Sequence, residues 1–181
     1  MKATLSALLV LAAVLVQTAV LNRLPLPWGI APDLVLLTVV AIALWSTPAA
    51  AAVTGFAAGL AVDVLPPADH EIGRTALLLC LAGYLLASIR DADMRWGLGP
   101  YLAAAATALG VPAAFLLIGL VLGDTRAALP AALWPVLGGA ALTLLVSPAV
   151  LGPLVPLVRR FSGDTRTDMP APWITAKGWG R

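Results

Sequence analysis

Residues 55–74 read GFAAGLAVDVLPPADHEIGR, and this stretch decides how the chain can fold. Its first half is an apolar run of small residues that ends on a carboxylate, Asp63, and Arg74 follows one short loop later. Gly55 and Gly59 are four residues apart, so they lie on one face of a helix and let a second helix approach closely. A short connection favours antiparallel neighbours. The stretch therefore predicts two helices that pack tightly against each other as a hairpin.

The composition places this hairpin in a membrane. Hydrophobic residues make up 61% of the 181 residues, charged residues make up 11%, and the mean hydropathy is +0.97. Soluble domains carry about 25% charged residues, so this chain cannot cover a water-facing surface. We expect an all-α integral membrane protein with no soluble domain and no nucleic-acid partner.

Charge-free runs indicate the membrane spans, because a spanning helix needs about 20 apolar residues. The run 34–62 is too long for one helix and is interrupted at residues 45–48, WSTP, where the proline fits the first turn of a new helix. The proline-rich last run could form a short interfacial piece and a kinked helix, which would leave five spans. The preferred prediction is a compact bundle of six transmembrane helices within residues 1–158, at about 3–21, 29–45, 48–65, 73–89, 98–122 and 132–157.

The distribution of Lys and Arg predicts the orientation, since cytoplasmic loops are enriched in these residues. With the N-terminus inside, eight of the eleven fall on the inner side (Lys2, Arg90, Arg95, Arg159, Arg160, Arg166, Lys177, Arg181) and three on the outer side (Arg23, Arg74, Arg126). We therefore predict a multi-pass protein of the bacterial plasma membrane with both termini cytoplasmic. The basic tail 159–181 is predicted to be disordered. Trp28 and Trp45 are predicted to anchor the second helix at the membrane surfaces.

Three charged residues are predicted near the outer ends of the helices. A charge deep in a membrane helix costs about 2.5–3.5 kcal/mol, and less near the headgroups. Asp63 lies less than one turn from Pro66, and Arg74 opens the next helix, so we expect an Asp63–Arg74 ion pair that closes the hairpin. Asp33 follows Pro32 at the start of a helix, where Asp often caps free backbone N–H groups. Two interpretations of Asp33 stay open, a helix cap and a direct contact with a partner.

The helix that follows the loop has its own stripe of residues spaced by four, Ala76, Cys80, Tyr84 and Ser88. The Tyr84 hydroxyl needs a hydrogen-bond partner in an apolar medium. This face is predicted to pack against the preceding helix.

The sequence contains no pattern typical of a catalytic or metal site. Residues 69–71, DHE, include three metal-capable side chains, but zinc ligands are usually separated by two or more residues. Asp33 and Asp63 could be imagined as the aspartyl pair of an intramembrane hydrolase, yet both are predicted at the outer edge of the bundle. We expect no enzymatic activity, no bound metal and no cofactor.

Three segments together resemble the MreD family of rod shape-determining membrane proteins: PDLVLL at 32–37, GFAAGLAVDVL at 55–65 and GRTALLLCLAGYLL at 73–86. The resemblance implies a non-enzymatic subunit of the bacterial cell-wall elongation machinery. Such a subunit acts with MreC, a single-pass membrane protein, and with MreB filaments, RodA and a transpeptidase. The resemblance also implies a fold similar to the substrate-binding subunits of energy-coupling-factor transporters.

On this interpretation the small-residue hairpin offers part of its surface to MreC and helps to link MreB filaments to extracytoplasmic peptidoglycan synthesis. The candidates for binding the partner or fixing the bundle are Asp33, Gly55, Gly59, Asp63, Arg74 and Tyr84. The alternative is a substrate-binding subunit of a vitamin transporter, which would need an outer ligand pocket lined by Trp, Tyr, Asn or Arg. A homodimer and a membrane lipid bound in the bundle also stay open.

Overall fold

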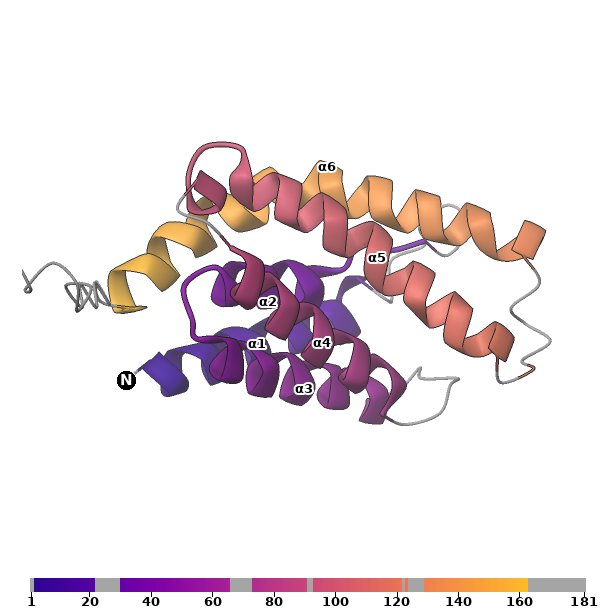
Figure 1. Ribbon diagram of the computed structural model, residues 1–181, viewed down its shortest axis with the longest axis horizontal. Helices are drawn as coiled ribbons and strands as arrows, with labels where there is room; N and C mark the ends of the chain where they lie inside the picture. The colour runs from indigo at the N-terminus through magenta and orange to yellow at the C-terminus, as the bar shows by residue number, and fades with distance from the viewer. Residues whose placement is uncertain are drawn as a thin grey trace, which may run out of the picture.

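The computed structural model describes residues 2–21, 30–65, 73–90, 93–121, 123 and 129–162. Within these ranges the chain forms six α-helices, a 3₁₀ helix and no strand (Figure 1). The elements are α1 (Lys2–Ala19), α2 (Leu34–Ala43), α3 (Pro48–Val64), α4 (Arg74–Ile89), η3 (Asp93–Arg95), α5 (Gly99–Val121) and α6 (Leu129–Ser162). Two segments of this described part, Gly99–Val121 and Leu133–Phe161, are long and apolar enough to cross a membrane. The predicted all-α class is thus confirmed, and the six-span arrangement stays a prediction.

The helix α2 lies at the centre of the bundle. Every residue from 35 to 44 is buried, and α2 contacts each of the other five α-helices. The prediction of a helix over 29–45 is wrong, because residues 30–33 are not helical and Asp33 takes the N-cap position. Pro32 accounts for the late start, since proline lacks an N–H and disfavours helix in the residue before it. Ten residues span about 15 Å, roughly half the hydrocarbon thickness of a bilayer, so α2 is too short to cross alone.

Trp45 follows α2, and its predicted role as an anchor at the membrane surface stays a prediction. Its indole is partly buried and meets Trp96 edge to face, with ring centroids 6.1 Å apart and an interplanar angle of 85°. The two residues therefore join the end of α2 to the segment before α5. Trp28 lies outside the described residues.

The helices α3 and α4 form the predicted hairpin. The predicted break at residues 45–48 is confirmed, because α3 begins at Pro48 and Thr47 is its N-cap. Thr47 Oγ1 accepts a hydrogen bond from the Ala50 N–H at 3.4 Å. Among the helix pairs described, α3 and α4 make the most extensive contact. The tight pairing inferred from Gly55 and Gly59 is therefore confirmed.

The helices α5 and α6 pack on each other and on α2, and in Figure 1 they run above the other four helices. α6 is continuous over 34 residues despite its internal prolines, so the alternative of a separate interfacial piece is wrong. Its C-terminal part turns away from the direction of the rest (Figure 1), as internal prolines make helices do. α6 also extends to Ser162, so the predicted tail is helical at its start; residues 163–181 lie outside the described ranges.

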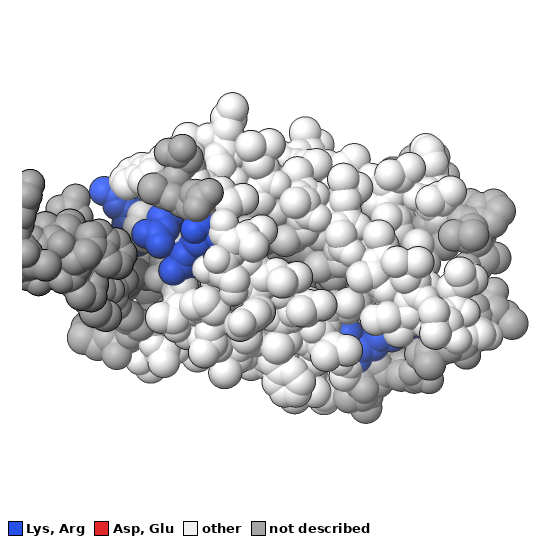
Figure 2. All heavy atoms as spheres, viewed as in Figure 1, with Lys and Arg blue, Asp and Glu red and all other residues white. Residues whose placement is uncertain are grey.

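The outer surface of the bundle is suited to lipid. Large apolar side chains are exposed on several helices, among them Val53 at 69%, Leu102 at 66% and Leu145 at 75%. On the face shown in Figure 2, basic side chains gather at the left, one small basic patch lies low on the right, and residues without charge cover most of the remaining described surface. Continuous apolar surface of this extent marks contact with a membrane or a partner.

Candidate functional site

Three glycines set the distance between α3 and α4. A Cβ atom added to Gly55 would lie 2.7 Å from the Leu79 carbonyl carbon, and one added to Gly59 would lie 2.5 Å from the Ala76 Cα. From the opposite helix, a Cβ on Gly83 would lie 2.7 Å from the Ala51 carbonyl oxygen. Each glycine thus faces the backbone of the other helix, and any larger residue would push the two helices apart.

The face of α3 that carries Gly55 and Gly59 is therefore covered by the α4 backbone and is not available to a partner. The stripe predicted on α4 is only partly right: Ala76 is buried, whereas Tyr84 is 48% exposed and Ser88 is exposed. Gly83, which sequence reasoning missed, lies against α3 in place of Tyr84. The spacing of Ala76 and Gly83 could have identified the face of α4 that packs on α3, because residues seven apart share a helix face.

Asp63 is 2% exposed and holds the start of α4. Its Oδ2 accepts hydrogen bonds from the Gly73 N–H at 2.8 Å and the Ala76 N–H at 3.1 Å. Gly73 is the N-cap residue of α4, has no side chain to cap it and adopts a φ of 100°, in the left-handed region that favours glycine. The carboxylate at the end of α3 thus supplies the cap that α4 lacks, at the positive end of its dipole.

Arg74 ties the same end of the hairpin to α5. Its Nη2 donates to the Phe115 carbonyl oxygen at 2.7 Å, and its Cζ lies 4.1 Å from the centroid of the Phe115 ring. Asp63 and Arg74 therefore both act at the first turn of α4, one on backbone N–H groups and the other on a neighbouring helix. The direct ion pair between them stays a prediction.

Asp33 caps α2, the first of the two interpretations that the sequence left open. Its Oδ1 accepts from the Leu36 N–H at 2.8 Å, and its own N–H donates to Thr143 Oγ1 of α6 at 2.9 Å. Gln17 of α1 bonds the same segment twice, accepting from the Leu34 N–H at 2.9 Å and donating to the Pro32 carbonyl at 3.0 Å. Three helices are joined at this point by side chains that satisfy the start of α2.

Arg90 binds the other end of α2, a role that the sequence analysis did not predict, since it counted Arg90 only toward the orientation in the membrane. Its Nη1 donates to the carbonyl oxygens of Ala43 and Ser46, at the C-terminal end of α2 and in the turn that follows. A cation is favourable there because the last carbonyls carry the negative end of the dipole. Burial lowers the pKa of Arg90, and the positive charge of Arg95 lowers it further, yet a guanidinium stays protonated in proteins.

A groove between α4 and α5 presents a second small-residue face, and this one is not filled. The groove encloses about 520 Å³ and is lined on α5 by Ala106, Gly110 and Ala114, each four residues from the next. A Cβ atom on Gly110 would meet nothing within 4 Å, in contrast to the glycines of the hairpin. The α4 side is lined by leucines, including Leu78 and Leu81. Such a surface fits the side of another apolar helix.

Asp33, Asp63 and Arg90 each bind backbone groups at a helix end. Asp33 and Asp63 accept backbone N–H groups at the starts of two different helices, which is not the arrangement of an aspartyl pair that shares a proton. No group of three His, Cys, Asp or Glu side chains suited to a metal occurs in the described ranges. Residues 69–71 lie outside them. The described part of the chain thus combines polar side chains that bind helix ends with exposed apolar surfaces.

The fold and these contacts thus define a class, a helical bundle of the membrane whose α3–α4 hairpin is its most tightly packed part. The chain belongs to the MreD family, since the model of that family, rod shape-determining protein MreD, matches residues 1–93 of the 181. The match covers α1 to α4 and ends at η3. No curated protein and no solved structure matches the chain. Membership assigns the protein a role in rod shape determination, in a family of structural membrane proteins that is not known as an enzyme family.

Proposed function

We propose that this protein is a membrane subunit of the bacterial cell-wall elongation complex, where it binds the membrane helix of an MreC-like single-pass protein. Through that contact it links MreB filaments on the inner side to peptidoglycan synthesis on the outer side, together with RodA and a transpeptidase. Family membership supports the shape-determining role. The proposed binding of the partner is supported by the groove between α4 and α5.

The observation that carries the proposal is the unfilled groove between α4 and α5. Its lining runs from Leu78 to Ile89 on α4 and from Leu102 to Ala114 on α5, which corresponds to about 18 Å of helix at about 1.5 Å per residue. Small residues at every fourth position allow close helix contact, which drives association between membrane helices where no hydrophobic effect operates. A single apolar helix is the partner that matches this length, polarity and spacing.

The hairpin has a supporting role in this proposal. Its glycines and the Asp63 cap fix α4 on α3, and Arg74 fixes the start of α4 to α5. Those contacts set the position of α4, which forms one wall of the groove. Tyr84 does not line the groove but is exposed on α4, where its hydroxyl is free to meet a second partner or another copy of the chain in a homodimer.

The proposed orientation places both termini in the cytoplasm. In Figure 1 the start of α1 and the end of α6 lie at the same end of the bundle. Arg159 and Arg160 are in the last turn of α6, and the predominance of Lys and Arg at this end favours the inner side. Asp63 and Arg74 then lie at the outer side.

This orientation also weighs against the vitamin-transporter alternative. A cavity lined by Trp, Tyr and Arg does exist, but it includes Trp45, at the opposite end of α3 from Asp63. A substrate-binding subunit would need such a pocket at the outer face.

The test is affinity purification of the tagged protein from its own membranes in mild detergent, with the copurifying proteins identified by mass spectrometry. We expect an MreC-like single-pass protein in the eluate. Copurification of ATPase and coupling subunits without such a protein would contradict the proposal and favour the transporter.

A further inference from the structure

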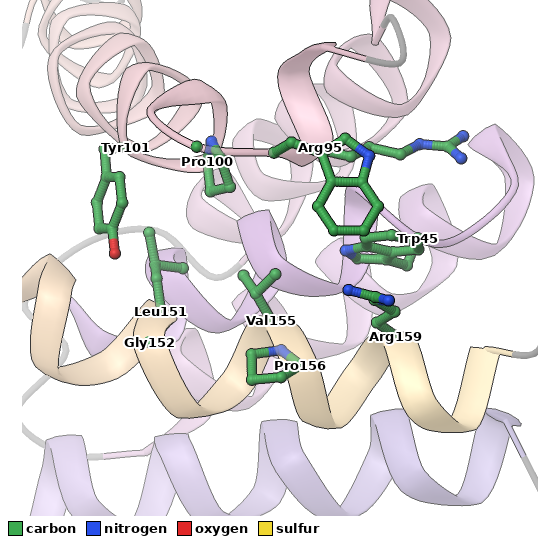
Figure 3. A pocket seen from close by; sticks show the side chains of 11 residues that line it. Trp45, Arg95, Pro100, Tyr101, Leu151, Gly152, Val155, Pro156 and Arg159 are labelled. Atoms are coloured by element: carbon green, nitrogen blue, oxygen red, sulfur yellow. The ribbon is translucent and has the colours of Figure 1, made fainter.

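A cavity at the basic end of the bundle combines cationic and apolar walls. It encloses about 220 Å³ between the end of α2, the segment from η3 into α5, and the last part of α6. Figure 3 shows Trp45, Arg95 and Arg159 gathered at one side of the cavity, with Tyr101 and Leu151 at the other. The cavity is separate from the α4–α5 groove, which shares none of these five residues.

The cationic wall is held by contacts with aromatic rings. The Arg159 Cζ lies 4.4 Å from the centroid of the Trp96 ring, and the Arg95 Cζ lies 5.4 Å from the Trp45 ring. The two indoles meet edge to face. Cation–π contacts fix the positions of the two guanidinium groups but leave their N–H donors available.

Two of the buried donors at this wall lack acceptors. Trp45 Nε1 and Arg95 Nε are inaccessible to solvent and have no hydrogen-bond partner among the described residues. A buried donor without a partner costs about 1–3 kcal/mol, and among the side chains that the structure describes no carboxylate lines the cavity. An anion drawn to this wall by the two guanidinium charges would supply an acceptor once these side chains turn toward the cavity, because neither N–H is accessible in the present arrangement.

From this geometry we infer that the cavity binds the phosphate group of an anionic membrane lipid. Two arginines and an indole N–H provide charge and donors for a phosphate. The opposite wall, with Leu151, Val155 and Pro156, is apolar and continues along α6, where it can receive the start of an acyl chain. The volume is below the roughly 300–1,000 Å³ of drug-sized ligand sites, which suits a headgroup whose chains remain in the bilayer. Basic pockets between membrane helices on the cytoplasmic side are suited to anionic lipid headgroups.

The experiment is native mass spectrometry of the full chain in detergent, titrated with phosphatidylglycerol or with phosphatidylcholine. We expect phosphatidylglycerol to bind about tenfold more tightly, from the attraction of the two arginines. The double variant Arg95→Gln/Arg159→Gln is expected to lose that preference. The matched control is Arg160→Gln, because Arg160 is the next residue on α6, is exposed and does not line the cavity; it is expected to bind as the unchanged protein does.

Two further measurements keep the inference open to refutation. Trp45→Phe keeps the aromatic ring but removes one donor, so it is expected to weaken phosphatidylglycerol binding several-fold even if the double variant fails to fold. Inorganic phosphate in large excess is expected not to displace the lipid, because it makes no use of the apolar wall. Displacement of the lipid by inorganic phosphate would show a site for a free anion. Equal binding of the two lipids, or an unchanged lipid preference in the double variant, would show only non-specific lipid binding. Each of these results would overturn the inference.

Discussion

Replacing Asp63 tests whether a carboxylate on one helix caps the next. Asp63→Ala removes the acceptor of two N–H groups, at 2.8 and 3.1 Å, in a site where Asp63 is 2% exposed. A hydrogen bond to a charged group contributes about 1.5–3 kcal/mol, and loss of a helix cap costs about 0.5–2 kcal/mol. Because the two bonds share one oxygen and are not additive, we expect a loss of about 3 kcal/mol in the free energy of unfolding. Asp63→Asn keeps an acceptor oxygen but not the charge, and is expected to cost about 1 kcal/mol.

The single cysteine provides the assay. Cys80 lies in α4, partly buried, and its backbone N would lie 3.1 Å from a Cβ on Gly55, so its reaction with a thiol-sensitive dye during heating reports separation of the hairpin. The Asp63→Ala variant is expected to melt about 6–12 °C lower, at about 2–4 °C per kcal/mol for a chain of this size. An unchanged midpoint in Asp63→Ala would refute the capping account. Equal losses in Asp63→Ala and Asp63→Asn would show that the charge matters and the acceptor geometry does not.

Three more predictions use the same melting assay. Gly59→Ala is expected to lower the free energy of unfolding by about 2 kcal/mol through overpacking, because its Cβ would meet the α4 backbone. Gly110→Ala has open space at its Cβ, so its free energy of unfolding should stay the same or rise by up to about 1 kcal/mol. Equal effects of the two changes would contradict the assignment of the filled hairpin and the unfilled groove. Arg90→Gln should lose about 2 kcal/mol, since two carbonyl oxygens at the end of α2 lose a charged donor, and an unchanged midpoint would remove Arg90 from the anchors of α2. Asp33→Ala should lose about 1 kcal/mol through the Leu36 cap, and a loss as large as that of Asp63→Ala would point to a further role for Asp33.

The hairpin could be predicted from the sequence because its signals are local. The spacing of Gly55 and Gly59, the break before Pro48 and the short loop together give two antiparallel helices in contact. The depth of Asp63 could be inferred, but not its partners, because a carboxylate near a loop can meet either an arginine or backbone N–H groups. The left-handed Gly73 and its missing side-chain cap explain why the N–H groups are among the partners of Asp63, and the ion pair with Arg74 stays a prediction.

The centre of the bundle could not be predicted in the same way. The sequence of an apolar helix does not show whether lipid or protein surrounds it. A membrane-spanning helix was therefore expected at α2, whereas α2 is a short helix buried in the bundle. The role of Arg90 depends on a contact 47 residues away along the chain, which no local pattern records. The groove likewise depends on how α5 lies beside α4, and alanine is so common in this chain that the spacing of residues 106, 110 and 114 does not stand out in the sequence.

The most direct test of the central proposal is site-specific photocrosslinking from α5 in living cells. A photoreactive amino acid is placed at Ala106, which lines the groove, and separately at Ala113, which is also exposed on α5 but lies outside the groove. The proposal predicts a crosslink to an MreC-like single-pass protein from position 106 and none, or far less, from position 113. Equal crosslinking from both positions, or none from 106 while the partner still copurifies, would contradict the groove as the binding site of that helix.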